Sequence, residues 1–406
     1  MENSIKLRRQ VIYILTSLMV MIITTSVLMG QAAGYPDPVD NPGSELMLSG
    51  QWVPDDPHDI DFFGLPRIPS EHSIVSDVRY AWGRKINQHN YLIHYDGLFW
   101  AMWSDGPGIA RDGVTAKEHR NVTPRHDQPG QMVSYSTSED GLNWSEPRYL
   151  TDPPFIDGFG WIARGFWVRD NKLLALVTHY NAPNFRGEGL QLHAYEMISH
   201  QEREWKHKGL VFDNAMNNFP PKKLPNGEWL MSRRDKDRDV YMLAGGNKGF
   251  DEWESFPVIS YHDDDMILEE PYWLLLPDNN IVALFRDNKR SGFLFRAFSI
   301  DNGRSWSRPV RTNFPDTRSK FSGLRLSDGR YVLVSNPNPE KRDPLTLAIS
   351  DDGLVFTKMG YLVGGRPVDY PHVIEHEGHL YIAFAGAKQT VEVLKILISD
   401  LDNIDF

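Results

Sequence analysis

The chain has 406 residues, a formal net charge of −11 at pH 7 and no cysteine. Without cysteine it forms no disulfide, so a large apolar core has to stabilise it. The negative charge and the lack of a basic cluster in the sequence argue against a nucleic-acid partner.

The N-terminus has the pattern of a secretory signal. Lys6, Arg8 and Arg9 precede a mostly apolar run, residues 11–29, and small residues including Ala33 follow. We therefore predict a bacterial signal peptide over residues 1–33 and a secreted or periplasmic protein. Because the apolar run is long for a signal, an uncleaved membrane anchor is the alternative.

The remaining chain divides into an arm and one domain. Residues 34–61 are rich in Pro and Asp and are interpreted as an N-terminal arm or linker. Residues 62–406 contain repeated strand-like segments without a competing helical periodicity. We predict one all-β domain here, a monomer that makes no stable membrane contact once the signal is cleaved.

Short turns that end in an aromatic residue recur along this domain. The clearest are SEDGLNW, SIDNGRSW and SDDGLVF, and the closing aromatic residues are Trp144, Trp205, Trp253, Trp306 and Phe356, at spacings of 61, 48, 53 and 50 residues. In the second turn, Asp301 can accept hydrogen bonds from the amides ahead, and Gly303 can adopt positive φ. Trp306 is expected to begin the next strand and to pack beneath the loop. A period near fifty residues indicates a repeat architecture.

Six β-rich segments each follow a turn signal. These segments begin at Asp96, Asp170, Asn226, Asp278, Asp328 and Glu377, a mean step of about 56 residues. Each is typical of a turn followed by the second strand of an antiparallel sheet. We predict a six-bladed β-propeller, although the 74 residues between the first two turns leave room for a seventh blade.

The turns resemble the Asp boxes of the sialidase superfamily, and six blades suit the exo-sialidases. Asp boxes also occur in unrelated propellers, so they support the fold more than the function. The resemblance extends to six residues in the family's order: Arg67 in GLPRIPS, Asp127 in RHDQPGQ, Glu270 in EEPYW, Arg286 in VALFRD, Arg342 in NPEKRDP and Tyr370 in RPVDYPH.

The resemblance implies a role for each of these residues. Arg67, Arg286 and Arg342 would clamp the carboxylate of an acidic sugar, because a guanidinium offers a planar fork that matches a carboxylate. Tyr370 would be the nucleophile, with Glu270 as acceptor of its proton. Asp127, with a pKa raised by burial, would protonate the leaving oxygen. The implied activity is that of a sialidase-like glycoside hydrolase acting on an acidic oligosaccharide or polysaccharide.

Histidines near the same segments support a second interpretation. His94, His126, His179 and Tyr180 could provide the acid and base of a β-elimination, in which an arginine-bound uronic acid loses its C5 proton. In this respect the chain is similar to propeller lyases that act on ulvan and related uronate polysaccharides, which have seven blades.

A third interpretation is a carbohydrate-binding propeller without turnover. The Trp-rich segments FWAMW, residues 99–103, and WIARGFW, residues 161–167, could then stack on sugar faces. No HExxH motif is present, and we expect neither a catalytic metal nor another cofactor. The particular sugar and linkage stay open.

Overall fold

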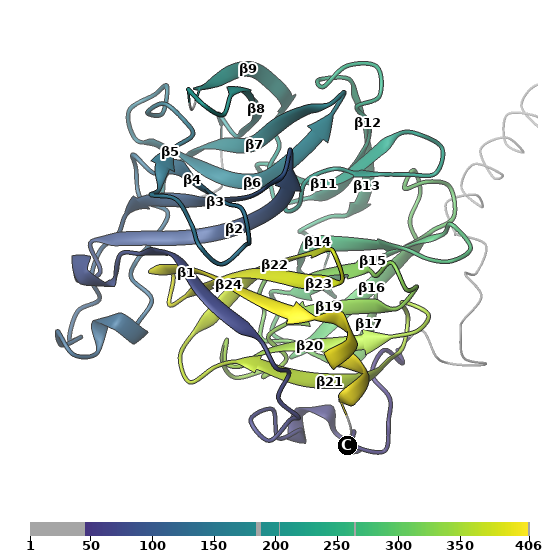
Figure 1. The fold of residues 1–406 in the computed structure, drawn as a ribbon. Helices are drawn as coiled ribbons and strands as arrows, with labels where there is room; N and C mark the ends of the chain where they lie inside the picture. Colours follow the sequence, from purple (N-terminus) through teal and green to yellow (C-terminus); the bar gives the residue numbers. More distant parts are fainter. Residues whose placement is uncertain (1–44, 184–187, 203, 264, 405–406) are drawn as a thin grey trace, which may run out of the picture.

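The computed structural model describes residues 45–183, 188–202, 204–263 and 265–404. These residues form six four-stranded antiparallel sheets arranged as the blades of a β-propeller (Figure 1). The predicted all-β class and six blades are confirmed. The alternative of a seventh blade is wrong for the described part of the chain, because the long early gap contains the connection between β3 and β4 instead.

The blades follow the chain in order, each from an inner strand outwards. The first three contain β2 (Lys85–Tyr95), β3 (Leu98–Pro107), β4 (Met132–Ser138) and β5 (Arg148–Tyr149); β6 (Phe159–Arg169), β7 (Lys172–Asn181), β8 (Gln191–Ser199) and β9 (Glu204–Asp213); and β10 (Lys222–Lys223), β11 (Trp229–Arg234), β12 (Val240–Gly245) and β13 (Trp253–Ile259). All six segments expected to be second strands occupy that position.

The last three blades repeat this order, except that the sixth takes its outer strand from the start of the domain. They contain β14 (Leu268–Leu275), β15 (Ile281–Asp287), β16 (Phe293–Ser299) and β17 (Val310–Pro315); β18 (Ser322–Arg325), β19 (Tyr331–Ser335), β20 (Leu345–Ser350) and β21 (Phe356–Val363); and β22 (Val368–His376), β23 (His379–Gly386), β24 (Thr390–Leu397) and β1 (Glu71–Asp77). Strand β1 pairs antiparallel with β24, from Glu71 opposite Lys395 to Asp77 opposite Thr390. This pairing closes the ring.

Four short 3₁₀ helices accompany the strands: η1 (Pro57–Asp59), η2 (Arg79–Ala81), η3 (His119–Asn121) and η4 (Ile398–Asn403). None of the helices in the described residues has the length and apolarity to cross a membrane. The predicted signal peptide over residues 1–33 lies outside the described residues. The described end of the arm packs on blade five, where Leu48 bridges Phe356 of β21.

The turn at residues 299–306 forms as predicted. The Asp301 carboxylate accepts hydrogen bonds from the backbone N–H of Arg304 and Ser305, and Gly303 has a φ of 84°. Trp306 is buried and donates its indole N–H to the Gly303 carbonyl at 3.0 Å. The expectation that Trp306 begins the next strand is wrong, since β17 begins at Val310. Pro309, which has no N–H for the ladder, intervenes.

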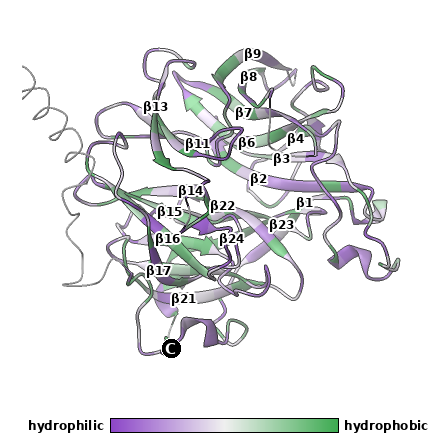
Figure 2. Ribbon diagram, turned by 180° about the vertical axis from the view of Figure 1, so that it is seen from behind, coloured by the Kyte–Doolittle hydropathy of each residue, from purple (hydrophilic) through white to green (hydrophobic). Residues whose placement is uncertain are grey.

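The core lies within and between the blades. Trp100, Trp103, Trp161 and Trp167 are fully buried there, so the two Trp-rich segments do not offer stacking surfaces for sugars. Figure 2 shows hydrophobic residues along many strands, whereas β2 is largely hydrophilic. The hydrophilic residues 87–90 of β2 are nevertheless buried. Because β2 is an inner strand, this run points to a polar interior near the propeller axis.

Candidate active site

Irregularities in four inner strands shape the site. In β2, the pairing register with β3 shifts between Gln88 and Tyr91. The inner strands β6, β14 and β22 each have a shift of the same kind against the second strand of their blade. A β-bulge re-aims a side chain out of the regular alternation of a strand. The residues inside these shifts include His89, Arg164, Glu270 and Tyr370, and all four line one cavity.

Three of the four bulge residues have a left-handed backbone. The φ angle is 56° at His89, 50° at Glu270 and 58° at Tyr370. A residue other than glycine in this region costs about 1–3 kcal/mol, and such residues cluster at functional sites. The strands therefore hold these side chains in the cavity at a cost in stability.

The cavity has a volume of about 710 Å³ and contains an excess of positive charge. Its walls carry seven cations, Arg164, Arg234, Arg238, Arg286, Arg318, Arg342 and Lys388, and four carboxylates, Asp127, Glu269, Glu270 and Asp369. Since the whole chain has a net charge of −11, this local excess of three positive charges is a feature of the site. Such a cavity suits an anionic ligand.

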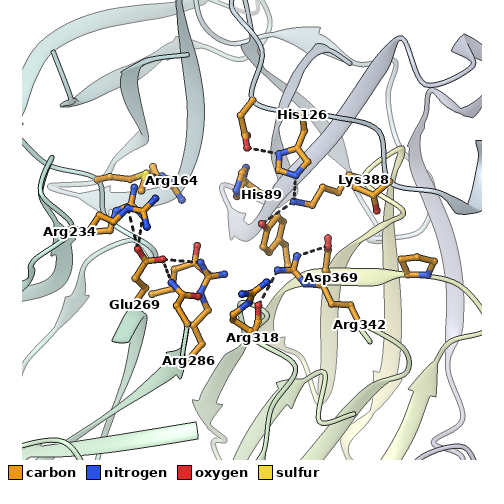
Figure 3. Close-up of a pocket in the computed structure, with 18 of the residues that line it drawn as sticks. His89, His126, Arg164, Arg234, Glu269, Arg286, Arg318, Arg342, Asp369 and Lys388 are labelled. Atoms are coloured by element: carbon orange, nitrogen blue, oxygen red, sulfur yellow. Dashed lines mark hydrogen bonds and ion pairs between the residues drawn. The ribbon is translucent and has the colours of Figure 1, made fainter. Parts of the chain in front are cut away.

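One wall is a network of arginines around Glu269 (Figure 3). The Glu269 carboxylate contacts Arg234 at 3.2 Å and Arg286 at 3.1 Å and accepts a hydrogen bond from the Asn288 amide at 2.6 Å. Burial alone would raise the pKa of Glu269, but Arg234, Arg286 and Arg238 lower it to about 2. Glu269 is thus an ionised anchor that fixes the arginines. Its neighbour Glu270 contacts Arg286 at 2.6 Å from inside the cavity.

Arg342 forms the base of the opposite wall. Its guanidinium pairs with Asp369 at 2.9 Å, donates to the Arg318 carbonyl at 3.0 Å and lies 5.4 Å from the centre of the Tyr370 ring. Burial opposes its charge, but Tyr370 and Asp369 raise the pKa of Arg342. The guanidinium therefore stays charged beside the tyrosine.

The Tyr370 hydroxyl lies among basic groups. It accepts a hydrogen bond from the Lys388 ammonium at 2.9 Å, and the His89 ring stacks on the tyrosine ring at 4.6 Å. Burial, with Arg164 and Lys388 nearby, lowers the pKa of His89 well below its usual value. A neutral imidazole therefore covers one face of the Tyr370 ring, and an ammonium group donates a hydrogen bond to its oxygen.

His126 and Asp127 form a dyad at the rim. The His126 Nδ1 atom makes a short hydrogen bond to the Asp127 carboxylate, and its Nε2 atom lies 3.1 Å from Lys388. Burial would raise the pKa of Asp127, but His126, Lys388 and a hydrogen bond from Gln88 lower it. The expected raised pKa of Asp127 is therefore wrong. Within this dyad, the Asp127 carboxylate orients the His126 ring.

Most of the predicted site residues meet in the cavity. Tyr370, Glu270, Asp127, Arg286, Arg342 and His126 all line it. The expected hydrogen bond between Glu270 and Tyr370 is absent among the described residues, because Tyr370 bonds to Lys388 and Glu270 pairs with Arg286.

Arg67 lies elsewhere, which corrects its predicted place in the carboxylate clamp. The residue bridges Tyr361 of β21 on the outside of blade five, with its guanidinium 4.2 Å from the tyrosine ring. Its Arg-Ile-Pro segment leads along this outer strand into β1 instead of onto an inner strand. Ile68, the next residue, is buried in the core.

Three residues of the elimination hypothesis also lie outside the cavity lining. His94 stacks on His376 at 3.7 Å, near the turn that follows β2. His179 packs against Phe159 at 4.6 Å within blade two, and burial lowers its pKa to about 4. Tyr180 is fully buried in the same blade. This packing keeps the three side chains out of the cavity lining and so corrects the acid and base roles predicted for them. Of the four residues in the elimination hypothesis, only His126 faces the cavity.

Sequence reasoning missed several lining residues. One signal was available: Arg234-Asp235 and Arg286-Asp287 end consecutive second strands in the same way, so the arginine at the end of β15 had a counterpart in β11. Lys388 lies in the turn between β23 and β24 and Arg318 in the connection from β17 to β18. Neither of these loop cations stands in a local pattern that distinguishes it.

Comparisons with known proteins agree with this architecture. Residues 219–382 match the family model of the BNR repeat-like domain. A structure of a Dyadobacter fermentans protein of unknown function superposes with a TM-score of 0.62 at 15% identity, over 82% of this chain and 100% of that one. No curated protein matches the chain.

Sialidases are among the similar structures. The Hadza microbial sialidase Hz136 has a TM-score of 0.59 at 14% identity, over 77% of this chain and 66% of its own. The NanB sialidase of Streptococcus pneumoniae has a TM-score of 0.57 at 12% identity, over 83% of this chain and 71% of its own. The chain is thus a sialidase-like, BNR-repeat β-propeller by fold.

Proposed function

We propose that the protein is a glycosidase-like enzyme that binds the carboxylate of an acidic sugar and hydrolyses the glycosidic bond beside it. The observation that carries this proposal is that Tyr370 lines one cationic cavity with Arg286 and with Arg342, whose guanidinium lies 5.4 Å from the centre of its ring. The sialidases with the same fold, among them NanB, favour this activity by analogy.

In this scheme Arg342 and its neighbours bind the sugar carboxylate. The Tyr370 oxygen attacks the anomeric carbon, and its proton passes to Glu270 in the same cavity. His126, oriented by Asp127, gives a proton to the leaving oxygen as the glycosidic bond breaks. Water then attacks the covalent intermediate with His126 as base, and Tyr370 leaves with the proton from Glu270. A neutral hydroxyl suits the role of nucleophile because a carboxylate would be repelled by the substrate.

Elimination is the second candidate, favoured by one observation. The Tyr370 oxygen bonds to Lys388 instead of Glu270, and a neutral His89 covers its ring. A tyrosine oxygen that accepts a hydrogen bond from an ammonium group can also act as a base. It would remove the C5 proton of a bound uronic acid, while His126 protonates the departing oxygen at C4 and a C4–C5 double bond forms.

The first experiment separates the two reactions. Oligosaccharides that end in sialic acid or in a uronic acid are incubated with the protein, and release of free sugar and ultraviolet absorbance are followed together. Free acidic sugar without new absorbance supports hydrolysis. New absorbance from a double bond conjugated with the carboxylate supports elimination. If neither signal appears with any acidic substrate, the enzymatic proposal is wrong and a binding propeller remains.

A further inference from the structure

Lys388 reaches the cavity from the turn between β23 and β24, residues 387–389. Two consecutive residues of this turn have a left-handed backbone, with φ angles of 49° at Ala387 and 52° at Lys388. Residues other than glycine cost about 1–3 kcal/mol each in this region, and they cluster at functional sites. The turn therefore directs the Lys388 side chain into the cavity at a cost in stability.

Blade one and η3 fix this turn from outside blade six. The Lys388 carbonyl accepts a hydrogen bond from the Asn87 N–H of β2 at 2.8 Å. The side-chain amide of Gln389 donates to the His119 carbonyl of η3 at 2.7 Å. Lys388 is itself only 2% exposed, so the fold determines where its ammonium group lies.

The ammonium group contacts two residues that the proposed hydrolysis uses. The Nζ atom donates a hydrogen bond to the Tyr370 oxygen at 2.9 Å and lies 3.1 Å from His126 Nε2, toward which it points in Figure 3. The four carboxylates of the cavity pair with other basic residues. Among the described residues, no carboxylate therefore competes with Tyr370 for the hydrogen atoms of Lys388.

One step of the hydrolysis places negative charge on the Tyr370 oxygen. When water attacks the covalent intermediate, a bond forms between the water oxygen and the anomeric carbon, and the water proton goes to His126. The bond between the Tyr370 oxygen and that carbon breaks, and its electron pair goes to the tyrosine oxygen before the proton from Glu270 arrives. A donor already fixed at the atom where charge develops lowers the barrier, because it does not have to reorganise during the reaction.

We propose that Lys388 is a catalytic residue, whose ammonium group stabilises the Tyr370 oxygen as it leaves the sugar in the second half of the reaction. The assignment rests on the proposed function of the cavity. It predicts that removal of the ammonium group slows hydrolysis of the covalent intermediate, so that this intermediate accumulates.

The first test is Lys388→Met, which keeps the approximate length of the side chain and removes its charge. The substrates are methylumbelliferyl glycosides of sialic acid and of glucuronic acid, whose aryl leaving group needs little protonation, so the first half of the reaction stays fast. We expect kcat to fall about 100- to 1,000-fold, the usual effect of losing one such donor. A rapid burst of methylumbelliferone that matches the protein concentration should precede the slow rate, and mass spectrometry of the quenched protein should find the sugar on Tyr370.

The matched control is Lys395→Met on the neighbouring strand β24. Lys395 lies outside the cavity lining and pairs with Glu71 at 3.6 Å. This variant should keep the kcat of the unaltered protein and show no added burst.

The second test restores the charge chemically. Because the chain has no cysteine, Lys388→Cys provides a single thiol. Alkylation with bromoethylamine forms a carbon–sulfur bond, releases bromide and returns an ammonium group close to its original position, whereas bromopropane adds a neutral chain of similar length. We expect turnover of the aminoethylated protein to exceed that of the propylated protein at least about tenfold.

The two proposals fail in different ways. A folded Lys388→Met protein with unchanged kcat, or with a lower kcat but no burst, would overturn the role of Lys388 while the hydrolysis stands. Equal turnover of the two alkylated proteins would overturn it as well, and this comparison decides if Lys388→Met does not fold. If the unaltered protein releases no free sugar from any acidic glycoside, the proposed function is wrong and the role of Lys388 falls with it.

Discussion

Tyr370 is the residue on which most of the proposed chemistry depends. A strand bulge turns it into the cavity, Lys388 holds its oxygen, His89 covers its ring and Arg342 lies below. These neighbours fix the ring and its oxygen from three sides. Tyr370 is therefore held in one orientation in the cavity.

Replacement of Tyr370 by Phe should stop turnover while the protein still binds its ligand. The change removes the reacting oxygen but keeps the ring that packs against His89. We expect kcat to fall by at least about 1,000-fold, or about 4 kcal/mol of transition-state stabilisation. Steady-state kinetics and calorimetric binding measure the two effects separately. Full activity in this variant would remove Tyr370 from the mechanism.

Arg342→Ala should abolish turnover by removing the carboxylate clamp. We expect kcat/KM to fall at least about 100-fold, equal to about 2.7 kcal/mol. Because this change leaves the buried Asp369 without its ion-pair partner, Arg342→Ala combined with Asp369→Asn is the control for stability. Circular dichroism checks the fold of both variants. An unchanged rate would contradict the role of Arg342 in substrate binding.

The strand hairpin is the element that could be predicted best from the sequence. Turns such as the one around Asp301 depend on local hydrogen bonds and on glycine, so a short stretch of sequence is enough to indicate them. The bulges at His89, Glu270 and Tyr370 depend on pairing between strands, and no local pattern shows them. This is why the turns could be predicted from the sequence, while the partner of Tyr370 and the cations from neighbouring loops could not.

Arg67 shows the limit of a short motif. Three residues, Arg-Ile-Pro, suggested a place for Arg67 in the carboxylate clamp, but the packing of Ile68 and the bridge to Tyr361 place the segment on the outside of blade five. Arg67 and Tyr361 are 294 positions apart in the chain. A local sequence pattern does not indicate contacts between residues so far apart.

Asp301→Ala should lower stability without changing activity. The carboxylate accepts hydrogen bonds from two backbone N–H groups and from the Ser305 hydroxyl. The turn does not line the cavity that contains Tyr370. We expect a loss of about 1–2 kcal/mol in the free energy of unfolding. Urea denaturation measures the loss, and kcat should match that of the unaltered protein. A strong loss of activity in a folded variant would contradict the separation of turn and site.

At the scale of the whole molecule, the ionisation of Asp316, a buried residue between β17 and β18, affects stability. Asp316 has a pKa of about 7 in the folded protein and 3.8 as its ordinary value. Between these pH values the folded state binds more protons than the unfolded state, so this group makes stability fall as pH rises from about 4 to 7. The buried Asp316 carboxyl group therefore lowers the free energy of unfolding near neutral pH.

Asp316→Asn should accordingly stabilise the ligand-free protein at pH 8 but not at pH 4. The amide cannot ionise, so the cost of a buried charge disappears, a gain of up to about 4 kcal/mol. Thermal unfolding of both proteins across this pH range tests the prediction. Parallel curves for the two proteins would show that Asp316 does not titrate in this window.

The pairing of β1 with β24 also has a consequence for how the protein is made. Strand β1, which completes the sixth blade, emerges from the ribosome before the other strands described, and its partner β24 emerges after them. Blades one to five can assemble during synthesis, since each consists of consecutive strands. The ring stays open until β24 has been synthesised, so a product truncated before β24 would expose an unpaired edge and be a substrate for proteolysis.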